Sequence, residues 1–125
     1  MKLAMLSFAA VQFAIALFQV VAPHAFFDSL GPFDRFNPHY MQDTAAFGAA
    51  LGVGLAAAAS RPSWRPPVLI VATAHYALHA ISHLVDIGDS DPGWVGYFDF
   101  ASVAGGAVLL AGLTVRALRE ERALR

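Results

Sequence analysis

The chain has 125 residues, of which 58% are hydrophobic and only 14% are charged, and its formal net charge is −1. This composition is typical of an integral membrane protein and excludes an ordinary water-soluble domain, in which about a quarter of the residues are charged; the near-neutral charge also argues against nucleic acid as a partner. Because the chain has no cysteine, disulfides, thiolate metal sites, iron–sulfur clusters and covalently attached c-type haem are excluded.

Four apolar segments follow one another along the chain, each close to the roughly 20 residues that a helix needs to cross the hydrocarbon core of a bilayer. They are residues 3–21, 41–59, 67–87 and 97–118. The first segment is interpreted as a span and not as a secretory signal, because its apolar stretch is long and no convincing cleavage site follows it. The sequence therefore predicts one all-α domain over residues 1–125, an integral membrane four-helix bundle.

The connection between the first and second segments, PHAFFDSLGPFDRFNPHY, is unusually aromatic. Its phenylalanines are Phe26, Phe27, Phe33 and Phe36. Phenylalanine interspersed with Asp, Arg and Pro predicts a short interfacial helix or re-entrant cap that lies on the bundle and shields its interior from water. The alternative is an ordinary aromatic belt at the lipid–water boundary.

The charges of the connections predict the orientation in the membrane. Basic residues occupy the RPSWRPP turn between the second and third segments and the end of the chain, namely Arg61, Arg65, Arg116, Arg119, Arg122 and Arg125. The other two connections carry Asp28, Asp34, Asp89 and Asp91. By the positive-inside rule, both termini are cytoplasmic in a multi-pass protein of the cell (inner) membrane, and the acidic connections face outward. The tail ALREERALR is expected to continue the last helix into solvent.

The third segment carries a polar stripe on one face, in the run ATAHYALHAISHLVD. The stripe consists of His75, His79, His83 and Asp86. At about 100° per residue these four side chains fall within about 80° of one another. Ionisable groups at bilayer depth are costly, and they usually face a protein interior where they pair, move protons or hold metal. This histidine stripe is therefore the candidate functional site.

Metal binding requires several unprotonated donors that converge on one point, and histidines four residues apart on a helix supply two. The expected first coordination shell consists of His39, Asp43, His79 and His83, in the outer half of the bundle. Asp86 is expected to bond a histidine or to bridge. His75 and His83 are about 12 Å apart along the helix axis, so His75 is expected to be a second-shell group, a relay or a ligand to a second ion.

Nitrogen and oxygen donors of this kind suit Zn, Fe, Cu or Mn. The chain is expected to be a membrane-embedded metal-binding protein. Such a site would suit a metal-dependent oxidoreductase or hydrolase that acts on an apolar small molecule from the bilayer.

Two alternatives do without a metal. In the first, the histidines are neutral and hydrogen-bond to nearby carboxylates and hydroxyls, which holds the helices together. In the second, His75, His79 and His83 form a proton or ion path in a non-enzymatic membrane subunit. Residues 68–74 offer only Thr73 to continue such a path toward the cytoplasm, which disfavours conduction through a monomer.

Two further alternatives concern haem and assembly. A b-type haem is the less favoured cofactor, held by His79 and by His39 or His24 from the opposite wall. Gly48 and Gly52 have GxxxG spacing, which is typical of closely packed membrane helices. Such small-residue faces also suit docking to a second copy of the chain or to a larger membrane complex.

Several of these residues also carry a resemblance. A Pro-containing outer loop that ends in Asn-x-His, an Asp four residues on, and a later span with spaced histidines that ends in Asp resemble a group of small four-span bacterial integral membrane proteins. The residues that carry the resemblance are Asn37, His39, Asp43, His79, His83 and Asp86. The resemblance implies the four-helix fold and a polar outer site, and it implies no established activity.

Overall fold

The computed structural model describes residues 1–33 and 35–123. Asp34 and Arg125, whose charges entered the predicted orientation, lie outside the described residues. The elements are α1 (Lys2–Val21), α2 (Pro23–Leu30), α3 (Pro38–Ala59), the 3-10 turn η1 (Pro62–Trp64), α4 (Arg65–Val85) and α5 (Trp94–Ala123). The predicted all-α class is confirmed over this part of the chain.

Three helical segments are long and apolar enough to cross a membrane. They are α1, residues 62–85, which comprise η1 and α4, and α5. The helix α3 has 22 residues but does not belong to this set. Its first turns carry Gln42, Asp43 and Thr44, and much of the remainder is alanine and glycine, which are less apolar than leucine or valine. By length and composition, three segments of the described chain could therefore span a membrane, and the predicted four-span bundle is not confirmed.

The helix boundaries differ from the predicted segments for local reasons. The helix α3 begins at Pro38 because the Asn37 side chain caps it, accepting hydrogen bonds from the backbone N–H groups of His39 (3.0 Å) and Tyr40 (3.1 Å). The helix α4 begins two residues before Pro67, since proline is tolerated in a first helical turn. The helix α5 is longer than predicted at both ends and continues into the charged tail, as expected.

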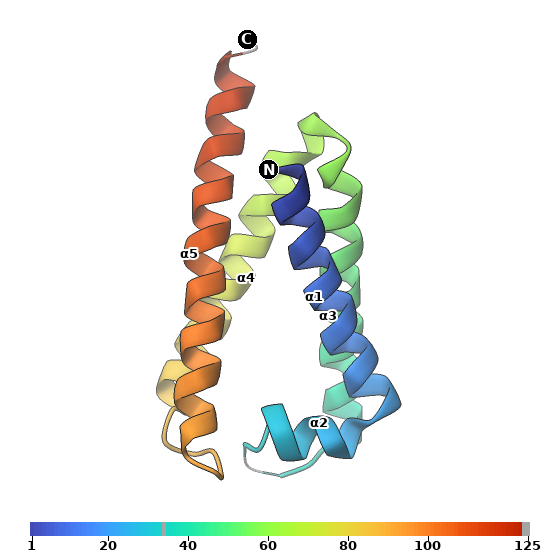
Figure 1. Ribbon diagram of the computed structural model, residues 1–125, viewed down its shortest axis with the longest axis vertical. Helices are drawn as coiled ribbons and strands as arrows, with labels where there is room; N and C mark the ends of the chain where they lie inside the picture. Colours follow the sequence, from blue (N-terminus) through green and yellow to red (C-terminus); the bar gives the residue numbers. More distant parts are fainter. Residues whose placement is uncertain (34, 124–125) are drawn as a thin grey trace.

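The long helices form two antiparallel pairs. The first pair is α1 and α3, and the second pair is α4 and α5. In Figure 1 the pairs converge at the end that holds η1 and both chain termini, and they diverge toward α2. The buried core lies at the convergent end and draws on all four helices, for example Met5, Leu55, Leu69 and Leu110. Toward the other end the two pairs leave a space between them that is lined by side chains.

The predicted short helix between the first two segments is present as α2. It lies across the open end between the two pairs (Figure 1). The Phe26 ring contacts Phe18 of α1 edge-on, with 5.5 Å between centroids. The following loop reaches the second pair, because Phe33 forms an antiparallel β-bridge with Ser90 and its ring lies 5.4 Å from that of His83. This aromatic segment therefore covers the diverging end of the two helix pairs.

Glycines permit close helix contacts within each pair. A Cβ atom at Gly52 of α3 would lie 3.1 Å from the Phe13 ring and 3.3 Å from the Ala9 carbonyl oxygen of α1. A Cβ atom at Gly106 of α5 would lie 2.6 Å from the Tyr76 ring of α4. The packing role predicted for Gly52 is confirmed, and Gly106 has the same role in the second pair.

Candidate functional site

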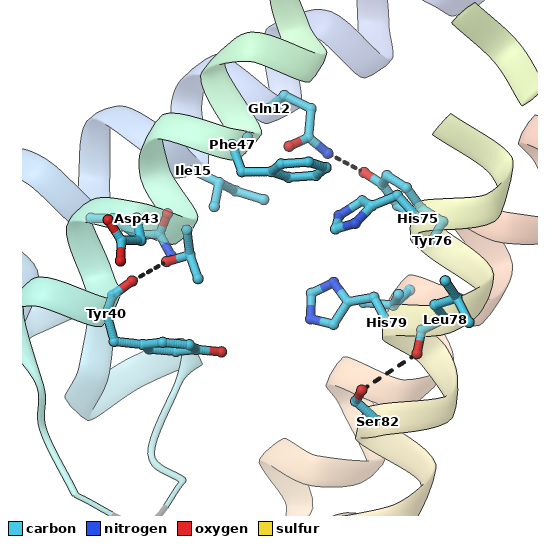
Figure 2. Close-up of a pocket in the computed structure, with 14 residues that line it drawn as sticks. Gln12, Ile15, Tyr40, Asp43, Phe47, His75, Tyr76, Leu78, His79 and Ser82 are labelled. Carbon is cyan, nitrogen blue, oxygen red and sulfur yellow. Dashed lines mark hydrogen bonds between the residues drawn. The ribbon is translucent and has the colours of Figure 1, made fainter. Parts of the chain in front are cut away.

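A pocket of about 520 Å³ lies between the two helix pairs. Its walls come from all four long helices, and Figure 2 shows the histidines of α4 facing the side chains of α3 across it. Gln12 and His75 each lie ten residues from the start of their helices, or about 15 Å along the axis, so the pocket begins near the middle of both helices. The lining residues from which the site is built are Gln12, Tyr40, Phe47, His75, Tyr76 and His79.

Gln12 and Tyr76 close the inner end of the pocket. Gln12 Nε2 donates a hydrogen bond of 2.7 Å to the Tyr76 hydroxyl oxygen. The Tyr76 ring is held in place by its close approach to Gly106 and by an edge-on contact with Phe8, with centroids 5.8 Å apart. Three helices thus position one phenol group at the pocket wall.

His75 lies beside this bond. Its ring is 4.7 Å from that of Phe47 on α3 and 5.8 Å from that of Tyr76. Within the described residues the His75 ring nitrogens make no hydrogen bond, although the side chain is half-buried. Figure 2 shows His75 and His79 pointing from α4 into the same space.

The α1–α3 wall is itself polar. Gln19 Nε2 donates a hydrogen bond of 3.1 Å to the Thr44 hydroxyl oxygen, and Gln19 is buried. Gln12 and Gln19 are seven residues apart, so they lie on one face of α1. That spacing is visible in the sequence, and together with Tyr40 and Tyr76 it is the part of the site that the histidine pattern alone missed.

His79 and His83 form a close pair along α4. Their Nε2 atoms lie 3.0 Å apart, and the ring centroids are 4.6 Å apart. The two nitrogens come from successive turns of one helix and are within hydrogen-bonding distance of each other. Phe33 of the covering loop packs against the His83 ring, so the pair lies just inside the aromatic segment.

The other predicted ligands lie apart from this pair. His39 and Asp43 interact with each other on α3, with 3.6 Å between Nε2 and Oδ2, and their side chains are 83% and 68% exposed. Asp43 lines the pocket on the wall opposite His79. Asp86 is exposed at the C-terminal cap of α4.

Over residues 1–33 and 35–123, no group of three or more His, Cys, Asp or Glu side chains is arranged to hold a metal ion. The six predicted ligands therefore divide into the His79–His83 pair, the His39–Asp43 pair, and His75 and Asp86 by themselves. The single close pair of ring nitrogens among them is that of His79 and His83 in the described part of the chain.

Comparison of the chain with protein-family models, with curated proteins and with solved structures gave no match.

Proposed function

We propose that this protein is an integral membrane protein that binds a transition-metal ion through His79 and His83. The observation that carries the proposal is the 3.0 Å separation of the two Nε2 atoms. Two metal–nitrogen bonds of about 2.0–2.1 Å that meet at about 95° span this distance. The two imidazoles therefore already have the spacing of neighbouring ligands on one ion.

Two protein nitrogens leave the rest of the coordination sphere open. In the proposed site, water and the Asp43 carboxylate complete it, and Asp43 reaches the ion when the two helix pairs close toward each other. Metal-dependent hydrolases and oxidoreductases also use a metal ion with open coordination positions, where water or substrate binds. Imidazole donors favour Zn and Cu over harder ions such as Mn.

The proposal includes a four-span topology in which α3 is the fourth span. Its 22 residues correspond to about 33 Å of helix, enough to cross the hydrocarbon core. It packs along α1, so its alanine and glycine face meets protein on one side. With the basic η1 turn and both termini in the cytoplasm, the histidine pair lies in the outer half of the membrane.

Metal titration of detergent-purified, chelator-treated protein tests the proposal. We expect about one Zn²⁺ or Cu²⁺ ion per chain, with binding weakened at least about ten-fold in His79→Ala and in His83→Ala. The matched control is His24→Ala, because His24 stacks on Phe36 in the covering segment, with centroids 4.0 Å apart, and is no part of the pair. An optical spectrum of the untreated protein detects b-type haem.

The proposal is contradicted if the wild-type protein binds no ion although its helical content and thermal transition show that it is folded. Equal binding in His83→Ala and wild type contradicts it as well. The 3.0 Å contact is in that case a hydrogen bond between two neutral imidazoles, which stabilises the helix and has no further chemistry.

A further inference from the structure

We infer that the pocket between the helix pairs binds a lipid-soluble molecule with a planar, oxygen-substituted ring, the chemistry of a quinone or its hydroquinone. The inference rests on the proposed function for the membrane setting of the pocket. The pocket is a separate site that shares one residue with the proposed metal site. His79 lines both sites, whereas His83 does not line the pocket.

The walls of the pocket suit a flat ring. In Figure 2 the rings of Phe47 and Tyr40, both from α3, bound the pocket from above and below, and His75 and His79 close it from the side of α4. Aromatic side chains on opposite sides of a space favour a planar occupant that stacks or meets their edges. A volume of about 520 Å³ lies within the range of about 300–1,000 Å³ found for small-molecule sites.

Hydrogen-bonding groups with unused capacity point into the pocket. The Tyr76 hydroxyl accepts a bond from Gln12, so its own proton is free to be donated. The hydroxyl of Tyr40 and the ring nitrogens of His75 have no hydrogen-bond partner in the described part of the chain. At bilayer depth such groups are costly unless something satisfies them. The oxygen substituents of a quinone-type ring match these donors.

The charges disfavour other kinds of head group. No lysine or arginine lines the pocket, and Asp43 does, so a phosphate or carboxylate would meet a like charge and no cation. A cationic head group would meet two imidazole side chains on α4 and one carboxylate that is already paired with His39. A neutral, oxygen-bearing ring is the head group with fewest unfavourable contacts.

The pocket also has a route to lipid. The helix α2 and the Phe33–Ser90 bridge lie across the diverging end of the two helix pairs. At the side, the lining residues Leu78 and Phe47 remain 66% and 49% exposed. An apolar tail attached to the ring would leave through this side opening into the bilayer.

Photoaffinity labelling with an azido-ubiquinone analogue, in the presence of a chelator, tests the inference. We expect saturable cross-links to α3 and α4 that are displaced by decylubiquinone and not by decanol, which has a similar tail and no ring. Tyr40→Phe removes only a hydroxyl, and His75→Phe keeps a ring against Phe47. Each variant should weaken the apparent affinity about five-fold, as expected for one lost hydrogen bond.

The control variant is His83→Ala, which should lose metal binding and label like the wild type. Labelling that does not saturate, that decanol displaces as well as decylubiquinone does, or that is unchanged in both Tyr40→Phe and His75→Phe overturns the inference. Because the labelling is done without metal, its failure is distinct from failure of the metal titration. Thermal unfolding of each variant shows that the comparison is between folded proteins.

Discussion

Gln12 and Tyr76 form a hydrogen bond of 2.7 Å between side chains 64 residues apart in the sequence. Within the described residues, it is the single bond between two side chains that joins the first helix pair to the second. The other side-chain bonds between helices lie inside a pair, as between Gln19 and Thr44 or between Thr73 and Thr114. The width of the pocket therefore depends on this contact and on the shared core at the convergent end.

Replacement of Gln12 by leucine should loosen the two pairs. The Tyr76 hydroxyl loses its partner in an apolar setting, so we expect a loss of about 1 kcal/mol in the free energy of unfolding. We also expect a larger distance between spin labels at Gln42 of α3 and Val85 of α4, both exposed. Introduced cysteines carry the labels specifically, since the chain has none.

The matched control for this experiment is Gln19→Leu. It breaks a bond of similar length inside the first pair, so it should cost similar stability and leave the distance between the labels unchanged. Equal distances in Gln12→Leu and wild type would show that the core alone sets the separation of the pairs.

Replacement of Gly106 by alanine should displace Tyr76. The added Cβ atom would lie 2.6 and 2.7 Å from two ring atoms of Tyr76, so the ring or the helix must shift. We expect a loss of about 1–3 kcal/mol in stability, as for other overpacked sites. The control is Gly105→Ala, where nothing lies within 4 Å of the added atom; there the better helix propensity of alanine should leave stability unchanged or higher. Equal effects of the two substitutions would contradict the close contact.

Much of the fold could be predicted because it follows from local patterns. Apolar runs of about 20 residues predict long helices, and the aromatic connection predicted the short helix α2. The histidine stripe was predicted from the 3.6-residue period, and the structure adds that the Nε2 atoms of His79 and His83 lie 3.0 Å apart. These features depend on residues close together in the sequence.

The arrangement of the pocket could not be predicted in the same way. Which helix packs on which depends on contacts such as Phe13 with Gly52 and Tyr76 with Gly106. The separation of the pairs depends on the contact of Gln12 with Tyr76. All of these residues are far from their partners in the chain. The i, i+4 spacing of His39 and Asp43 predicted that they share a face of α3. It carried no information on their distance from His79, and in the structure the two residues interact with each other.

The proposed topology makes Ser63 and Ser29 markers of opposite sides of the membrane. Both are exposed serines, Ser63 in the basic η1 turn and Ser29 in α2, so Ser63→Cys and Ser29→Cys are mild changes. In intact cells a membrane-impermeant maleimide should label Cys at position 29 and not at position 63, because the basic turn stays in the cytoplasm. If only position 63 is labelled, the orientation is the reverse of the one proposed. If neither position is labelled until the cells are opened, both connections lie in the cytoplasm.

Acidification should release the ion from the proposed metal site. A metal binds the neutral imidazole, so protons compete for the same nitrogen atoms, and the ordinary histidine pKa is about 6.5. Binding should therefore be complete near pH 8 and fall as the pH is lowered toward about 4, most steeply when both His79 and His83 must lose a proton for each ion bound. Equilibrium dialysis against Zn²⁺ over this pH range measures the effect.

The steepness of this pH profile separates the pair from a single-histidine site. If both imidazoles ligate the ion, the logarithm of the apparent affinity should fall by about two per pH unit well below the histidine pKa, and by about one in His83→Ala, whose weaker site has one imidazole. His75→Phe should keep the wild-type slope, because His75 is not a member of the pair. A wild-type slope of one would leave a single histidine as ligand, and equal slopes in wild type and His83→Ala would mean that His83 does not hold the ion. Either result would remove the 3.0 Å contact as the basis of the site.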